Sequence, residues 1–269
     1  MKHAFRRRLQ AGERLLGTLV SLASPEIAEI LAGAGFDWLF LDAEHAPLNA
    51  PRLQRILQGA GPAVPCLVRL PGRDEVFVKK ALDIGAAHIV GASMGGMIAQ
   101  MIAIEHPDRV LSLTSIMSTT GASDMGQPDP EAMMALLTPP PTDREGAIAS
   151  TVETSRIIGG SLFDEADARA RAAEAYDRCF HPAGAAFQIA AIAATGDRTE
   201  RLRQVQVPTL VIHGREDSLV TLSGGEATAA AVPGADLLVL GQMGHDIPRV
   251  YWPQVADAIF GIAVRGEDR

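Results

Sequence analysis

Ser93 is the residue of this chain whose surroundings best suit a nucleophile. It lies in the sequence GASMG at positions 91–95, between an apolar run at 87–90 and a run of helical character at 97–105. Glycines on both sides of a serine permit a strained strand-to-helix turn that exposes the hydroxyl group. The sequence therefore predicts a nucleophile elbow, in which the backbone N–H of Met94 serves as an oxyanion donor.

An acid and a base follow Ser93 in an order that suits a catalytic triad. Asp217 comes after the apolar run 207–212, and His245 comes after a second short apolar run. The two residues are 28 positions apart, which leaves room for one helix and one strand between them. We expect Asp217 to orient His245, and His245 to take the proton from Ser93. Glu216 is the alternative acid.

The first 86 residues predict three strand–helix units and a parallel sheet. Each unit has a short apolar run followed by a helical run that ends near a glycine. Strand–helix–strand order with short connections favours right-handed crossovers between parallel strands. The expected strands are 15–22, 37–42 and 65–70, and the expected helices are 27–34, 51–58 and 74–82, which end at Gly35, Gly59 and Gly85. Before the first helix, Ser24 is the expected N-cap and Pro25 the first helical residue.

Polar side chains gather where the second and third of these strands end. Asp42, Glu44 and His45 come with the end of the second strand, and Arg69 lies near the end of the third. Ligands of parallel α/β folds bind at this edge of the sheet. These residues are therefore a second candidate site.

The first part of the chain resembles the metal-dependent pyruvate aldolases of the 4-hydroxy-2-oxoheptanedioate aldolase family. The matching stretches are GTLVSLASPEIAEILAGAGFDWLFLDAEH, PCLVRLPG and KKALDIGA. The resemblance implies a (βα)8 barrel in which His45 is the general base and Arg69 holds the pyruvate carboxylate or enolate, with Glu44 as a further residue of the aldolase remnant. The family's metal-binding Glu and Asp lie on later strands, and this sequence leaves the pattern before reaching them. Enolate chemistry of this type needs the divalent ion, so we do not expect aldol cleavage.

The rest of the chain resembles α/β-hydrolases of the aclacinomycin-methylesterase and haloperoxidase-like group. The matching stretches are HIVGASMGGMIAQMIAIEHPDRVLSLTSIMSTTG, VPTLVIHGREDSLV and GQMGHDIP. The resemblance implies that Ser93, Asp217 and His245 are nucleophile, acid and base, and that residues 121–203, with a helical run at 165–178, form a cap. The loop that carries the second oxyanion donor in this family has no counterpart here, which implies an enzyme of low efficiency.

The composition favours a protein that acts on small molecules. The formal net charge of −8 gives no broad attraction to nucleic acid or to an anionic membrane, and no apolar run has the length of a membrane span. Cys66 and Cys179 are too few for a disulfide framework and favour a reducing, cytoplasmic location. No group of His, Cys and acidic residues has the spacing of a metal site, so we expect no cofactor.

We predict an α/β fold with a predominantly parallel sheet that joins part of a (βα)8 barrel to an α/β-hydrolase. The aldolase-like segment spans 1–86 and the hydrolase segment 87–269, and we expect them to pack as one domain. The second sheet face then needs cover from a barrel-like curl, from a final helix at 253–264 or from another chain in a homo-oligomer. An engineered chimera, a natural recombinant and a product of gene assembly would all have such a sequence.

The first functional hypothesis is a serine hydrolase that cleaves a small-molecule carboxylic ester. The alternatives are a metal-dependent aldolase or lyase and a chimera without catalytic activity. Ester cleavage that depends on Ser93 supports the first, and pyruvate exchange that depends on a divalent metal supports the second.

Overall fold

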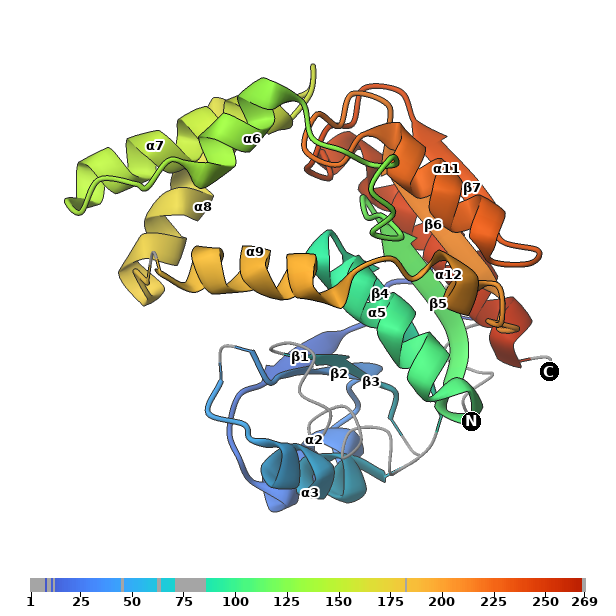
Figure 1. The fold of residues 1–269 in the computed structure, drawn as a ribbon. Helices are drawn as coiled ribbons and strands as arrows, with labels where there is room; N and C mark the ends of the chain where they lie inside the picture. Colours follow the sequence, from blue (N-terminus) through green and yellow to red (C-terminus); the bar gives the residue numbers. More distant parts are fainter. Residues whose placement is uncertain are drawn as a thin grey trace. The chain divides into compact units, whose positions relative to one another are not determined.

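The computed structural model divides into two compact units, Met1–Ala87 and His88–Arg269 (Figure 1). It describes residues 8, 11, 13–44, 46–61, 64–70, 86–181 and 183–267. The described strands form two sheets, one with the order β1-β2-β3 and one with the order β4-β5-β6-β7. The two units are described in turn.

Unit 1 contains a three-stranded parallel sheet and two of the three expected helices. Its elements are β1 (Gly17–Val20), α2 (Pro25–Gly33), β2 (Trp38–Asp42), α3 (Ala50–Ala60) and β3 (Cys66–Arg69). Residue Gly17 pairs with Trp38 and Leu39 pairs with Cys66, in parallel register. The parallel sheet is thus confirmed, whereas its continuation into a barrel stays a prediction. The helix expected at 74–82 lies outside the described residues.

The helices of unit 1 begin as the sequence predicts, but one ends later. Ser24 Oγ accepts a hydrogen bond from Ile27 N at 3.2 Å and so caps α2. Gly59 does not end α3, because it lies inside the helix; a Cβ there would lie 2.4 Å from the carbonyl oxygen of Pro25. The helix ends instead at Gly61, whose φ of 61° suits glycine. Gly59 therefore permits close approach of the segment that begins α2.

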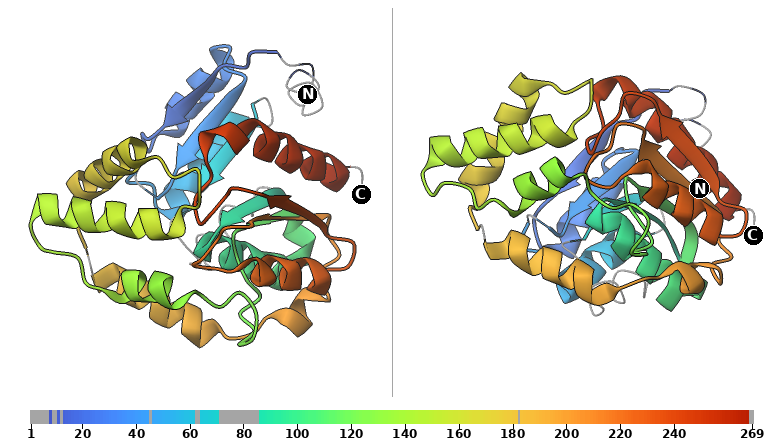
Figure 2. Two further views of the ribbon diagram at one scale, coloured as in Figure 1. Left: turned by 90° about the horizontal axis from the view of Figure 1, so that it is seen from above. Right: turned by 45° about the horizontal axis from the view of Figure 1, so that its top comes forward.

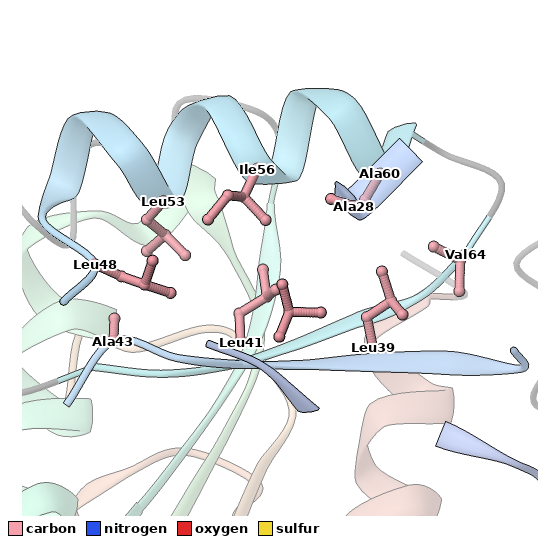
Figure 3. Packing of buried hydrophobic residues seen from close by; sticks show 10 residues of the cluster. Ala28, Leu39, Leu41, Ala43, Leu48, Leu53, Ile56, Ala60 and Val64 are labelled. Carbon is pink, nitrogen blue, oxygen red and sulfur yellow. The ribbon is translucent and has the colours of Figure 1, made fainter. Parts of the chain in front are cut away.

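The buried core of unit 1 lies between one face of the sheet and its helices (Figure 3). Leu39 and Leu41 are two positions apart on β2 and point toward Leu53 and Ile56 of α3 (Figure 3). All four side chains are fully buried. Leu19 on β1 and Leu67 on β3 are instead 57% and 54% exposed. The strands alternate their side chains between the two faces, so the core that the described residues of unit 1 form lies on one face of this sheet.

Unit 2 contains a four-stranded sheet with helices on both faces. Its main elements are β4 (Ala87–Ala92), α5 (Met94–Glu105), β5 (Val110–Ile116), β6 (Thr209–Gly214), α11 (Leu222–Ala231), β7 (Asp236–Leu240) and α12 (Trp252–Glu267), with short 3-10 helices η2 (Pro107–Arg109) and η3 (Arg249–Tyr251). In Figure 2, α11 lies on one face and α12 on the other. Of the three expected ways to cover the second face, α12 provides one: its Val255 and Ile262 are buried against Ile212 and Leu240.

Between β5 and β6 the chain forms a helical insertion. It consists of α6 (Pro130–Leu137), α7 (Arg144–Ile158), α8 (Glu165–Arg178), α9 (Ala183–Thr195) and α10 (Thr199–Leu202). The helix predicted at 165–178 is confirmed as α8. Helices α7 and α8 pack together through a small cluster that includes Ile148, Val152 and Ala172. Within the described parts of the chain, no helix is both long and apolar enough to cross a membrane.

Candidate active site

Ser93 lies at a sharp turn between β4 and α5. Its φ of 54° falls in the left-handed region, which is unfavourable for a residue with a side chain. The turn is held in place because Ser93 N donates to the carbonyl oxygen of Ile116 on β5, at 2.8 Å. A Cβ at position 91 would lie 1.9 Å from the carbonyl oxygen of Gly95, whereas a Cβ at Gly95 would meet nothing within 4 Å. Gly91 is therefore the glycine that this turn requires.

The structure brings together the three residues predicted to form a triad. His245 Nδ1 lies 2.8 Å from Asp217 Oδ2, and His245 Nε2 lies 2.7 Å from Ser93 Oγ. A carboxylate only accepts hydrogen bonds, so Nδ1 carries the ring proton and Nε2 is free to accept the hydroxyl proton of Ser93. The Asp217 and His245 side chains are 0% and 8% exposed, so this relay is shielded from water. Helix α11 and strand β7 occupy the stretch between acid and base, as expected.

The acid that contacts His245 is Asp217 and not its neighbour Glu216. Asp217 Oδ1 accepts hydrogen bonds from the amides of Leu219 and Val220, at 3.0 and 2.8 Å, which leaves Oδ2 for the histidine. Glu216 Oε2 instead accepts from both the hydroxyl and the amide of Ser161, each at 2.6 Å. These hydrogen bonds lower the pKa of the Glu216 carboxyl. The two adjacent acids thus serve different parts of the molecule.

Buried His213 contacts the turn that carries the acid, a role that the sequence did not reveal. Its Nε2 donates to the carbonyl oxygen of Val220 at 2.7 Å, which closes the turn around Asp217. Its Nδ1 has no hydrogen-bond partner among the described residues, and a Cβ at Gly225 would lie 2.4 Å from that atom. Burial lowers the pKa of His213. The sequence gives no signal for the contact of His213 with residue 220.

Met94 is in the position expected for an oxyanion donor. It is the first residue of α5, directly after Ser93. The first amides of a helix have no intrahelical acceptor, and the positive end of the helix dipole favours negative charge there. The Met94 N–H is therefore oriented by the same turn that exposes the Ser93 hydroxyl.

A second serine, histidine and acid lie together elsewhere in unit 2. His88 Nδ1 is 2.9 Å from Ser112 Oγ, and His88 Nε2 is 3.2 Å from Glu267 Oε1. Ser112 is only 1% exposed and lies within β5 instead of at a turn. A substrate carbonyl has no access to a hydroxyl that is buried in this way, so this group links β4, β5 and the end of α12.

In unit 1, Arg69 is held by the acids at the neighbouring strand end. Its Nε donates to Asp42 Oδ1 at 2.9 Å and lies 3.3 Å from Glu44 Oε2, and its Nη2 donates to Asp42 Oδ2. His45 lies outside the described residues. Among the residues that the structure describes, no three His, Cys, Asp or Glu side chains are grouped to hold a metal ion. A guanidinium between Asp42 and Glu44 is also a poor neighbour for a cation, so the described residues do not fit the aldolase metal.

Two family models match this chain, each over one of the resemblances found in the sequence. The alpha/beta hydrolase fold family matches residues 73–248, and the HpcH/HpaI aldolase/citrate lyase family matches residues 16–92. Both resemblances are thereby confirmed, and the two matches overlap at the run that leads into the elbow.

The aldolase relatives match only the beginning of the chain. A 4-hydroxy-2-oxovalerate aldolase from Novosphingobium aromaticivorans is 43% identical over 86 residues, which are 31% of this chain and 33% of that protein. The chain thus spans about a third of the length of the curated relatives that it matches.

Solved structures with a similar fold include hydrolases. A meta-cleavage product hydrolase from Pseudomonas fluorescens is 23% identical with a TM-score of 0.54, over 73% of this chain and 72% of that one. An enol-lactonase from Burkholderia xenovorans is 16% identical with a TM-score of 0.52, over 96% and 93%. Identities this low establish a shared fold only.

Proposed function

The chain belongs to the alpha/beta hydrolase fold family, and from this premise we propose that it is a serine hydrolase that cleaves carboxylic esters. Ser93 is the nucleophile, His245 the general base and Asp217 the residue that orients it. The observation that carries the proposal is the unbroken relay of 2.7 Å and 2.8 Å contacts from the Ser93 hydroxyl through the imidazole to the Asp217 carboxylate. A relay of this order is how a neutral hydroxyl becomes a nucleophile at neutral pH.

The reaction begins when Ser93 Oγ attacks the ester carbonyl carbon and its proton passes to His245 Nε2. Asp217 stabilises the imidazolium, and the Met94 N–H donates to the oxyanion of the tetrahedral intermediate. When the intermediate collapses, the alcohol leaves with the proton from Nε2 and the acyl group stays on Ser93. A water molecule then gives a proton to Nε2 and attacks the acyl carbon. Collapse of this second tetrahedral intermediate breaks the bond to Ser93 Oγ, which takes the proton back from Nε2, and the acid is released.

The enzyme we propose is an inefficient one. Residues 16–92 match the aldolase family, so the sequence that precedes the elbow is not the one that supplies a second oxyanion donor in hydrolases. The loss of one such donor typically lowers kcat by about 10²–10³-fold. The finer fold that goes with this proposal is a hybrid of an aldolase-like segment at 1–86 and a hydrolase segment at 87–269, whose helical insertion acts as the cap.

An ester is the substrate that we propose, in a cytoplasmic setting. An ester carbonyl is more electrophilic than an amide carbonyl and has a better leaving group, so it suits a serine that has a single backbone oxyanion donor. Cys66 and Cys179 are both free, which is compatible with a reducing compartment. Burial raises the pKa of the Cys66 thiol to about 11, which keeps it protonated and unreactive at neutral pH.

The aldolase alternative has support from sequence but less from the described geometry. The match to the aldolase family at residues 16–92 favours it, whereas the ion pairs of Arg69 with Asp42 and Glu44 oppose it. Exchange of the pyruvate methyl protons for deuterium with added Mn²⁺ or Mg²⁺ would test it. Exchange that disappears in Arg69→Ala would favour the lyase, and an inactive chimera would show neither this exchange nor ester cleavage.

Hydrolysis of p-nitrophenyl butyrate by three forms of the protein tests the proposed function. Ser93→Ala should reduce the rate to the level of buffer, because it removes the nucleophile. Ser112→Ala is the matched control, since Ser112 also contacts a histidine but is buried, and it should retain the wild-type rate. Equal loss in both variants, or activity that survives Ser93→Ala, would contradict the proposal.

A further inference from the structure

The loop that follows His245 is joined to helix α8 by a row of alternating charges. Arg171 on α8 donates to Asp246 through its two terminal nitrogens, Nη2 at 2.7 Å and Nη1 at 3.2 Å. Arg171 Nε also lies 3.0 Å from Asp167 Oδ2, one turn earlier on α8. Asp167 Oδ1 in turn accepts from Arg249 Nη2 at 2.8 Å. Asp246 is the immediate neighbour of His245, so this network acts on the backbone that carries the base.

The end of helix α7 holds the same loop and also the loop of the acid. The amide of His245 donates to the carbonyl oxygen of Ile158 at 2.6 Å. The hydroxyl of Ser218, next to Asp217, donates to the carbonyl oxygen of Ile157 at 3.1 Å. These carbonyls belong to the last turn of α7, where no intrahelical donor remains for them. One helix end thus binds both the acid loop and the base loop.

We propose that Arg171 is a positioning residue, through which the packed pair α7–α8 holds His245 between Asp217 and Ser93. The inference rests on the proposed serine hydrolase function. A proton relay tolerates little displacement, and errors near 1 Å in a catalytic group can lower rates by about 10²-fold. The Arg171–Asp246 pair fixes the loop on one side of His245, and the Ile158 carbonyl fixes the backbone of His245 itself. Arg171 does not touch the reacting atoms, so it acts only through the histidine.

The insertion also contains a matched ion pair that makes no contact with these loops. Arg144 on α7 contacts Asp177 on α8 through two nitrogens, at 2.7 and 2.8 Å. The Arg144 side chain is 44% exposed and that of Arg171 is 53% exposed. Both pairs are therefore solvent-exposed Arg–Asp forks that involve the same helix, and only the Arg171 pair reaches the loop of the base.

The inference is tested by comparing Arg171→Ala with Arg144→Ala. The rate constant for labelling by a fluorophosphonate probe should fall about tenfold in Arg171→Ala and less than twofold in Arg144→Ala. With p-nitrophenyl butyrate the loss should appear in kcat and leave KM unchanged, because Arg171 positions the base and does not bind substrate. Arg171→Lys, which keeps the charge but not the fork, should recover part of the rate and serves also if Arg171→Ala fails to fold.

Hydrogen exchange gives a readout that does not depend on activity. The amide of His245 should exchange faster in Arg171→Ala than in wild type, and remain at the wild-type rate in Arg144→Ala. Equal labelling rates and equal exchange in the two variants would overturn the role of Arg171 while leaving the hydrolase proposal in place. A folded wild-type protein that the probe does not label would instead overturn the proposed function, and the positioning role of Arg171 with it.

Discussion

Both units contain strands joined by helices, yet among the residues that the structure describes the serine–histidine–aspartate relay lies in unit 2. In unit 1 the charged residues at the strand ends neutralise one another, as Arg69 does with Asp42. In unit 2 the acid at a strand end is oriented by backbone amides, and one of its oxygens is left for His245. Polar residues at the carboxyl edge of a sheet thus become a candidate site only where other elements supply partners that orient them and do not neutralise their charge.

The two units also differ in how many faces of their sheets are covered by described side chains and helices. The sheet of unit 1 has a dense core on one face, with Leu19 and Leu67 exposed on its strands. The sheet of unit 2 has α11 on one face and α12 on the other. Unit 1, which is 43% identical to an aldolase over 86 residues, thus has one covered sheet face among its described residues, whereas unit 2 has two. Local sequence similarity reports the local elements, whereas a catalytic site depends on elements far apart in the chain.

The largest expected effect separates the two adjacent acids of unit 2. Asp217→Asn should lower kcat for ester hydrolysis by about 10⁴-fold, since the amide no longer stabilises the imidazolium or fixes the ring tautomer. Glu216→Gln should have a much smaller effect, because Glu216 bonds to Ser161 and not to His245. Steady-state kinetics of both variants would check this. A comparable loss of kcat in Glu216→Gln would contradict the assignment of Asp217 as the acid of the relay.

The next largest effect is a loss of stability when a side chain is removed from the core of either unit. Leu41→Ala in unit 1 and Ile212→Ala in unit 2 each remove a fully buried side chain. Each should reduce the free energy of unfolding by about 2–5 kcal/mol through lost burial and a residual cavity. Hydrogen exchange resolved by peptide should locate the faster exchange in strands β1–β3 for the first variant and in β4–β7 for the second. Identical exchange maps for the two variants would show that the cores are not separate.

A smaller effect depends on pH and arises from His213 in unit 2. Burial holds the pKa of its ring below the usual value of 6.5, so the unfolded chain binds a proton that the folded chain does not. Stability from this residue is complete above pH 6.5 and should be lost progressively as the pH falls below it. Thermal unfolding at pH 7.5 and 5.5 should show His213→Gln losing less stability on acidification than wild type. If the variant loses as much stability between pH 7.5 and 5.5 as wild type does, His213 is not the cause of the acid destabilisation.

The smallest effect is expected in unit 1. The Arg69 side chain is 40% exposed, so solvent screens its pairs with Asp42 and Glu44. Arg69→Ala should lower the free energy of unfolding by less than about 1 kcal/mol, and should leave ester hydrolysis unchanged. Denaturant titration and p-nitrophenyl butyrate kinetics would measure both. A large loss of hydrolysis would mean that unit 1 contributes to the chemistry.

The elements of the fold could largely be predicted from sequence, because their signals are local. Ser24 and Pro25 start α2 as predicted, and the helix at 165–178 has the predicted bounds. The end of α3 was predicted wrongly, at Gly59, because a glycine that permits close packing resembles one that ends a helix. The close approach of Gly59 to the start of α2 cannot be predicted from the sequence of α3 alone.

The candidate site could be predicted as a set of residues but not as an arrangement. Motif order indicated Ser93, Asp217 and His245, whereas the different partners of Asp217 and Glu216, His245 and Ser161, depend on tertiary contacts. The link from Arg171 to Asp246 joins positions 75 residues apart and leaves no pattern in the sequence. Contacts of this kind depend on the tertiary fold, and so they were missed.

The central claim is that Ser93 in unit 2 is the catalytic nucleophile of this chain. Mass spectrometry of the intact protein and of its peptides, after reaction with a fluorophosphonate, tests it most directly. The account predicts one adduct per chain on the peptide that contains Ser93, and no adduct in Ser93→Ala. A folded protein without an adduct, or an adduct on another residue that persists in Ser93→Ala, would contradict it.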